Sequence, residues 1–221
     1  MSIRIAIDAM GGDYAPYEIV KGAVLAAKEY KVGIQLIGNE EEIKAELAKY
    51  DTNNLDIVIT NATEIIEMGE SPGKAIRTKK DSSIVKTVEA VAKGESQALV
   101  AAGSTGAAMA ASLFGLGRLP GIDRPAIACL LPTLKRPVVL IDAGANSSCE
   151  PEMLYQFAIM GSIFAQQVLG YEEPRIGVLN IGGEAGKGNE LAQNTYKLLS
   201  EKTDKINFAG NVEGRELFQG V

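Results

Sequence analysis

Short apolar runs alternate with amphipathic stretches along almost the whole chain, and this alternation constrains the fold more than any other feature. The runs that predict strands lie at residues 3–8, 33–38, 55–60, 97–102, 137–142, 175–180 and 206–210. The stretches with helical periodicity lie at 16–30, 40–50, 84–93, 106–116, 151–169 and 189–202. This pattern predicts an α/β fold, a mostly parallel sheet with helices on both faces. Several strands are nearly continuous in Ile, Val, Leu and Ala, which favours burial on both faces. We expect residues 1–221 to form a single domain.

The residues that are missing narrow the chemistry. The chain contains no histidine, which excludes a Ser-His-Asp triad, a Cys-His pair and a zinc site that uses histidine. Its two cysteines, Cys129 and Cys149, show neither a disulfide framework nor metal-ligand spacing, and they fit a reducing compartment. No GxGxxG motif follows a predicted strand, which argues against a dinucleotide site. We predict no cofactor and no metal.

The charge and hydropathy of the chain limit its partners and its location. The formal net charge is −6, which argues against duplex nucleic acid as a partner. Any anion site must therefore be built locally. The sequence shows no signal peptide and no apolar run of the roughly 18 residues that span a bilayer, so we expect a cytoplasmic protein.

The first predicted strand leads into a turn that carries Asp8, Gly11, Gly12 and Asp13. In a parallel α/β sheet, ligands bind beyond the carboxyl ends of the strands. A glycine pair lets the backbone approach a ligand, and the helix that follows offers free N–H groups to an anion. The other interpretation is a tight turn in which Asp13 caps the helix, and the turn taken alone favours it.

The fourth predicted strand leads into a turn that is rich in small donors. Two hydroxyls, two glycines and a helix start make this turn suitable for an anion. Its residues are Gly103, Ser104, Thr105 and Gly106. Close packing of the helix on the strand through small residues explains the same sequence equally well.

Two later strand ends carry amides and a lysine. Asp142 and Asn146 follow the fifth predicted strand, where Asn146 either orients an anion or forms an Asx turn. The sequence NIGGEAGKGN follows the next strand and contains Lys187 and Asn189. It departs from a nucleotide P-loop, because Gly188 stands where Ser or Thr is required. A site for a smaller anion and a mobile surface loop are the two interpretations of this stretch.

A cationic stretch, ESPGKAIRTKKDSS, lies between the third and fourth predicted strands. Among its cations are Arg77, Lys79 and Lys80. Such a cluster suits phosphate or an acidic protein partner, and the other interpretation is a solvated charged face.

Taken together and in order, these segments resemble the PlsX family of phosphate acyltransferases. The matching segments are IDAMGGDYAP, ESPGKAIRTKKDSSI, AAGSTGAAMAA, GIDRPAIACLLPT, DAGANSSCEPEMLYQFAIMGSIF, GVLNIGGEAGKGNEL and INFAGNVEGRE. Tyr14 and Ser104 depart from the family, which commonly has His and Asn there. The family pattern continues beyond Val221, so the resemblance implies the N-terminal portion of a longer chain.

The resemblance implies a fold like that of phosphotransacetylases and isocitrate/isopropylmalate dehydrogenases. It implies transfer of an acyl group from acyl-[acyl-carrier protein] to inorganic phosphate, for phosphatidic acid synthesis. The protein would be a homodimer, peripherally attached to the inner membrane face, where a glycerol-3-phosphate acyltransferase receives the product. The alternatives are an enzyme that uses coenzyme A thioesters, a dehydrogenase of the related fold, and a non-catalytic scaffold.

The chemistry of the loops suggests a role for each candidate residue. We expect phosphate to be bound by Gly103, Ser104, Thr105, Gly106 and Arg77. We expect the catalytic groups at the thioester carbonyl to be Lys187, Asn189 and Asn146. The residues that organise the loops are Asp8, Gly11, Gly12 and Asp13. Lys79 and Lys80 are expected to contact the carrier protein.

Overall fold

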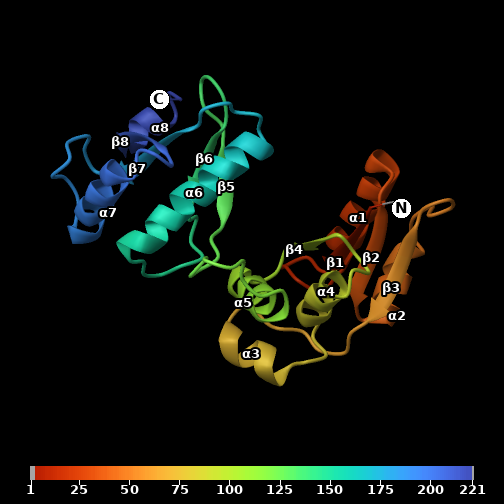
Figure 1. The fold of residues 1–221 in the computed structure, drawn as a ribbon. Coiled ribbons are helices and arrows are strands. Elements are labelled where there is room, and N and C mark those ends of the chain that lie inside the picture. The colour runs from red at the N-terminus through yellow and green to blue at the C-terminus, as the bar shows by residue number, and fades with distance from the viewer. Residues whose placement is uncertain (1–2, 221) are drawn as a thin grey trace. The chain divides into compact units, whose positions relative to one another are not determined.

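The computed structural model describes residues 3–220 (Figure 1). The chain divides into two compact units, the first ending at Arg118 and the second beginning at Leu119. Strands alternate with helices in both units and pair mostly in parallel, which confirms the predicted fold class. The division into compact units does not decide how many domains the chain has, so a single domain over residues 1–221 stays a prediction.

The first unit contains a parallel sheet in the order β3-β2-β1-β4. Its strands are β1 (Arg4–Asp8), β2 (Gly33–Gly38), β3 (Ile57–Asn61) and β4 (Ala98–Ala101). Its helices are α1 (Tyr17–Tyr30), α2 (Glu40–Leu47), α3 (Pro72–Thr78), α4 (Ser83–Ala92) and α5 (Thr105–Gly115). Because the strands are parallel, the carboxyl ends of β1 and β4 lie side by side, and Asp8 pairs with Ala101.

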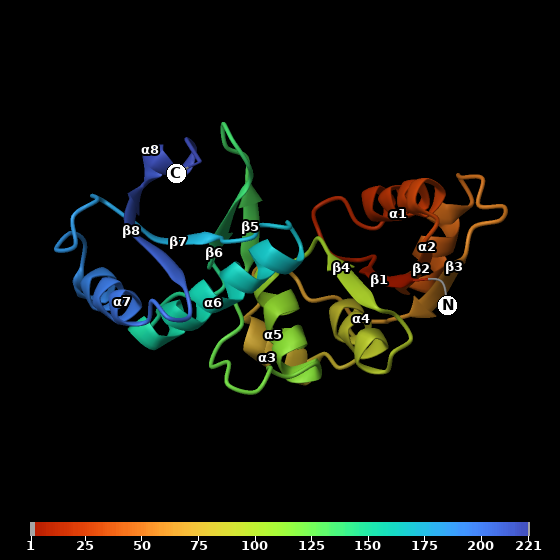
Figure 2. The ribbon, with the colours of Figure 1, turned by 45° about the horizontal axis from the view of Figure 1, so that its top comes forward.

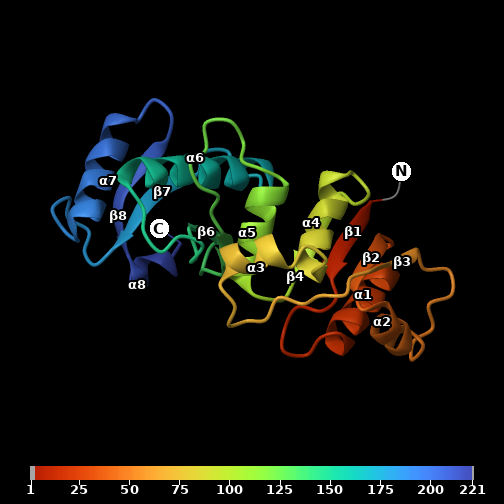
Figure 3. The same ribbon diagram turned by 90° about the horizontal axis from the view of Figure 1, so that it is seen from below.

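Helices cover both faces of this sheet, with α1 and α2 on one face and α4 on the other (Figures 2 and 3). Side chains alternate between the faces along a strand. Ile7 of β1 therefore packs with α1, whereas Ala6 packs with α4. Asp8 has the parity of Ala6 and so lies on the α4 face. Ile34 and Leu36 of β2 are fully buried against α1, and such a side chain contributes about 1.5–3 kcal/mol.

The second unit contains two short sheets. Its strands are β5 (Ala128–Leu131), β6 (Val138–Ile141), β7 (Arg175–Asn180) and β8 (Asn207–Glu213). Its helices are α6 (Pro151–Gln167), α7 (Glu190–Glu201) and α8 (Gly214–Leu217). β5 and β6 form an antiparallel pair, and β7 and β8 form a parallel pair joined by α7. A hydrophobic core packs against β7 and β8, and its buried residues are Ala158, Leu199 and Ile206.

The structure differs from the sequence-based expectation at three places. β5 and α3 were not predicted, and β5 makes the pairing of β6 antiparallel. α3 forms because Pro72 suits a first helical turn and because Ala75 and Ile76 are buried. Burial on both faces holds for β2 but not for β4 and β7, whose exposure alternates. In the described part of the chain, no helix has the length and apolarity to cross a membrane.

Candidate functional site

The two glycine turns of the first unit pack backbone against backbone. A methyl group placed on Gly11 would lie 2.8 Å from the Gly103 nitrogen and 2.9 Å from its Cα. Gly12 has a φ of +99°, and a methyl group there would lie 3.0 Å from the Ala102 carbonyl oxygen. Only glycine fits such positions without displacing backbone. The turns after β1 and β4 therefore form one structural element.

The buried carboxyl of Asp8 lies beneath these turns. Its residue is 4% exposed, and the Met10 backbone N–H donates to Oδ1 at 3.2 Å. Burial raises the pKa of the Asp8 carboxyl, while hydrogen bonds from the Ser83 hydroxyl and the backbone of Met10 and Gly11 oppose the rise. The carboxyl thus joins the first turn to the start of α4.

A small cavity separates the two turns from α4 and α5. Its polar lining comes from Asp8, Ser83 and Ser104, with the backbone of Gly11 and Gly103 between them. Its volume is about 10 Å³, which is room for about one water molecule. A phosphate group is larger, so it would bind at the mouth of this cavity or widen it.

The second turn leads into α5, and the N-terminus of this helix borders the cavity. Ser104 is the N-cap of α5, and its Oγ accepts a hydrogen bond from the Ala107 N–H at 3.3 Å. A helix N-terminus attracts anions through its free N–H groups and its dipole. Gly106 packs against α3, because a methyl group there would lie 2.8 Å from Pro72 Cγ. Close packing of the helix therefore explains Gly106, whereas anion binding at Gly103 and Ser104 stays a prediction.

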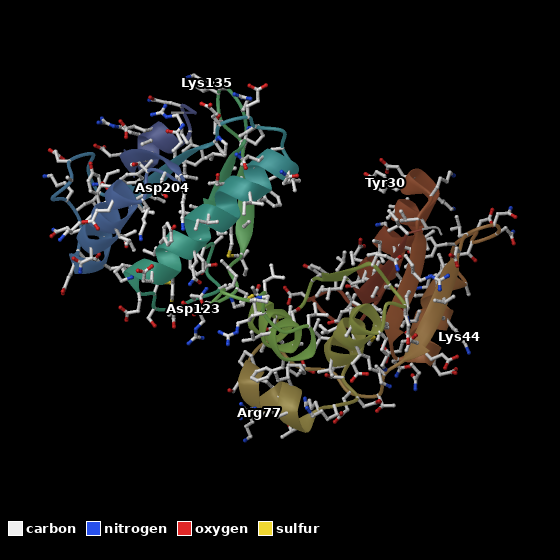
Figure 4. All side chains as sticks on the ribbon, in the orientation of Figure 1. Tyr30, Lys44, Arg77, Asp123, Lys135 and Asp204 are labelled. Carbon is white, nitrogen blue, oxygen red and sulfur yellow. The ribbon has the colours of Figure 1, made fainter. Side chains whose placement is uncertain are left out.

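The three candidate cations do not line the cavity. The guanidinium of Arg77 on α3 (Figure 4) stacks over the Phe114 ring, 5.6 Å from its centroid. Lys79 Nζ is bound to Glu70 at 2.5 Å and to the Ile65 carbonyl oxygen at 2.7 Å. Lys80 is exposed. Lys79 therefore tethers a loop, while Arg77 and Lys80 face solvent.

In the second unit, Asn146 is hydrogen-bonded to the carboxylate of Asp142. Asp142 accepts from the backbone N–H groups of Ile127 (2.8 Å), Ala145 (3.2 Å) and Asn146 (2.8 Å). The Asn146 side-chain amide donates to Asp142 at 3.1 Å and to the Pro125 carbonyl oxygen at 2.9 Å. Burial raises the pKa of the Asp142 carboxyl, but these hydrogen bonds outweigh it, and the net result is a lowered pKa.

The glycine-rich loop between β7 and α7 is held by side-chain amides. Asn211 on β8 donates to the Glu184 carbonyl oxygen at 2.8 Å, and Asn180 donates to that of Lys187 at 3.1 Å. Gln193 on α7 donates to the carbonyl oxygens of Gly186 and Gly188. These hydrogen bonds hold the backbone of the loop in place, which argues against the interpretation as a mobile surface loop.

Within this loop, the Lys187 side chain is exposed, and Asn189 is the N-cap of α7. Asn189 Oδ1 accepts from the Ala192 N–H at 3.0 Å, which leaves its side-chain N–H groups available to a ligand.

The structure brings only some of the predicted site residues together. Asp8, Gly11, Gly103 and Ser104 line one cavity, whereas the predicted catalytic residues belong to the second unit. Asp13 does not cap α1, whose N-cap is Pro16. Neither Ser83 nor Asn211 is among the residues that the sequence predicts for the site. Their roles arise from contacts between distant segments, so no local pattern marks them. In residues 3–220, His, Cys, Asp and Glu form no group of three that could hold a metal.

Comparisons with known proteins place this geometry in a family. A family model described as fatty acid synthesis protein matches residues 3–221. The chain is 56% identical over 218 residues to the phosphate acyltransferase of Pelotomaculum thermopropionicum, covering 99% of this chain and 63% of that protein. It is 55% identical over 218 residues to the phosphate acyltransferase of Desulforamulus reducens, covering 99% and 65%. The chain thus spans less than two thirds of the length of these relatives.

Solved structures show the same fold. A phosphotransacetylase from Streptococcus pyogenes has a TM-score of 0.71 at 17% identity, over 96% of this chain and 68% of that one. EutD phosphotransacetylase from Staphylococcus aureus has a TM-score of 0.67 at 16% identity, over 96% and 69%. At such low identity the likeness establishes the fold alone. The match to the family model, supported by the close relatives, shows that the chain belongs to the fatty acid synthesis protein family, the PlsX family of phosphate acyltransferases.

Proposed function

We propose that this protein transfers a fatty acyl group from acyl-[acyl-carrier protein] to inorganic phosphate, giving acyl phosphate for phosphatidic acid synthesis. The observation that carries the proposal is the joined pair of glycine turns, where the Gly103 backbone, the Ser104 hydroxyl and the start of α5 border one cavity. The names of the relatives support the same reaction.

The reaction suits a site without histidine. A phosphate oxygen attacks the thioester carbonyl, so that a C–O bond forms and the C–S bond breaks. The electron pair leaves on the carrier sulfur, and an ordinary thiol, such as free cysteine with a pKa of about 8.5, gives a thiolate that is a fair leaving group. Phosphate is already anionic at neutral pH and needs little help from a base. The protein must mainly position the reactants and stabilise the developing oxyanion.

The roles of the individual residues follow from their surroundings. We assign phosphate to the turn that holds Gly103, Ser104, Thr105 and Gly106, with Arg77 as an outer cation. Lys187 has an exposed ammonium and is the first candidate for the carbonyl oxygen. Asn189 can donate its side-chain N–H groups while it caps α7. Asn146 already donates to two acceptors, so its role is to hold Asp142.

The proposed partners follow from the chemistry. The acidic carrier protein would meet the exposed cations Arg77 and Lys80, while Lys79 stays bound to Glu70. Acyl phosphate would pass to a membrane glycerol-3-phosphate acyltransferase at the inner face of the membrane. We propose a cytoplasmic homodimer that attaches to that face peripherally.

The test uses the full-length protein with acyl-[acyl-carrier protein] and phosphate, and traps acyl phosphate as a hydroxamate. Hydroxamate that requires both phosphate and protein is expected, and its absence refutes the enzymatic function. Lys187→Ala should lower the rate at least tenfold, whereas Lys197→Ala, a change of an exposed cation on α7, should not. Equal rates in the two variants would remove Lys187 from the mechanism.

A second candidate function is acyl transfer between coenzyme A and phosphate, which the phosphotransacetylase fold favours. Comparing coenzyme A and carrier-protein thioesters of the same acyl chain separates the two. A higher kcat/KM with the coenzyme A thioester would replace the first proposal.

A further inference from the structure

The Asp8 carboxyl and the donors of the second turn border the same small space. A methyl group on Gly11 would lie 2.9 Å from Asp8 Oδ2 and 2.8 Å from the Gly103 nitrogen. Asp8 Oδ2 and the Gly103 nitrogen therefore both lie within 3 Å of one point beside Gly11, and both residues line the same cavity. An oxyanion that reaches the Gly103 N–H from this cavity also reaches the Asp8 carboxyl.

Among the described residues, Asp8 is the one titratable group that lines the cavity. β2, β4 and α5 contribute no charged side chain at all. On α4, Lys86 is paired with Asp81 and Glu89 with Lys93. The segment that carries Ile65 and Ile66 also has charged groups, which are Glu64, Glu67 and Glu70. The turn after β1 adds Asp13, which is exposed.

In this arrangement a bound oxyanion would lie beside the negatively charged carboxylate of Asp8. Asp8 is 4% exposed, so solvent screens it weakly, and the cavity lining brings no cation to compensate. A second anion beside a carboxylate favours the protonated form of that carboxyl. A protonated carboxyl also has an O–H that donates a hydrogen bond, which turns repulsion into attraction.

We propose that Asp8 is a ligand of the bound oxyanion in its neutral form, and that the anion enters the site together with one proton. The proposal rests on the proposed function, because it places phosphate at the Gly103 turn. The proton comes from solvent and stays on the Asp8 carboxyl, and no other bond changes. Asp8 thus has a binding role in addition to holding the first turn.

The burial that already raises the pKa of Asp8 lowers the cost of this protonation. Ser83 acts in the opposite direction, because its hydroxyl donates to the charged form of the carboxyl. Removing the Ser83 hydroxyl should therefore make protonation easier without removing Asp8.

Sulfate is the probe of choice, because it resembles phosphate in shape and stays a dianion across the neutral pH range. Its binding to the full-length protein is measured by titration calorimetry, in buffers of different ionisation enthalpy, which counts the protons taken up. We expect one proton per sulfate above the pKa of free Asp8, where the affinity falls about tenfold per pH unit.

Two variants locate the proton. Asp8→Asn keeps the size of the side chain and an N–H donor, so sulfate binding should take up no proton and lose this pH dependence. At the alkaline end it should bind sulfate at least tenfold more tightly than the wild type. Ser83→Ala should keep the proton uptake and shift the fall in affinity to higher pH.

The inference is refuted if wild-type sulfate binding takes up no proton, or if Asp8→Asn keeps the wild-type pH dependence. It is also refuted if sulfate fails to bind. Ser83→Ala decides the question if Asp8→Asn does not fold, since an unshifted pH profile in a folded Ser83→Ala protein would contradict the role of Asp8. Phosphate-dependent hydroxamate formation judges the proposed function separately, because activity can persist when the proton uptake is absent.

Discussion

Replacing Gly11 with alanine tests the joined turns most simply. The added methyl group would lie 2.8–2.9 Å from two backbone atoms of Gly103 and from Asp8 Oδ2. These distances are about 0.5 Å shorter than ordinary van der Waals contact, and two of the three atoms belong to the backbone of Gly103. The turns must therefore separate to accept it.

Overpacking of this kind costs about 1–3 kcal/mol. For a protein of this size, a cost of about 2 kcal/mol lowers Tm by roughly 4–8 °C. The methyl group also fills the space between Asp8 and Gly103, so sulfate affinity should fall at least tenfold. Thermal unfolding followed by circular dichroism measures the first effect, and titration calorimetry measures the second.

Gly22→Ala is the matched control. Gly22 lies in α1, and nothing stands within 4 Å of the added methyl group. This change should raise the free energy of unfolding by up to about 1 kcal/mol, because alanine favours the helix. A Gly11→Ala protein with the stability and sulfate affinity of the wild type would refute the packing of the two turns.

Three further substitutions test the caps and the Asp142 network. Ser104→Ala removes the acceptor that caps α5 and should lower the free energy of unfolding in urea by about 0.5–2 kcal/mol, and an unchanged value would contradict the cap. Asn189→Ala should cost the same amount at α7, and the loss should be smaller with glycine, which caps better than alanine. Asp142 has a lowered pKa in the folded state, so its stabilisation is complete above the ordinary carboxyl pKa and disappears as pH falls through the lowered value. The difference in unfolding free energy between wild type and Asp142→Asn should therefore shrink in acid, and a constant difference would refute the network.

The sequence predicts the part of the site that follows from local rules. Parallel strands place their carboxyl ends at one edge of a sheet. This rule predicts that the turns of Gly11 and Gly103 both lie at the edge where ligands bind. Side-chain alternation along β1 then puts Asp8 on the face that α4 covers. Residues whose role depends on long-range contact were missed. Ser83 and Asn211 act on loops that are distant in the sequence, and no periodicity encodes such contacts.

The secondary structure that was missed has the same cause. The antiparallel pairing of β6 depends on β5, a four-residue strand in the apolar run of residues 126–131, and such a run does not specify the strand with which it pairs. α3 has only seven residues, and it is held by packing of Ala75 and Ile76 against the core rather than by its own propensity. The exposed positions of β4 and β7 depend on which helices cover each sheet, which no single strand specifies.

A crystal structure of the protein with phosphate tests the central claim most directly. The account predicts a tetrahedral anion at the mouth of the cavity, within hydrogen-bonding distance of the Gly103 N–H and the Ser104 hydroxyl. Phosphate bound only at another place, in a protein that forms acyl phosphate, would contradict it.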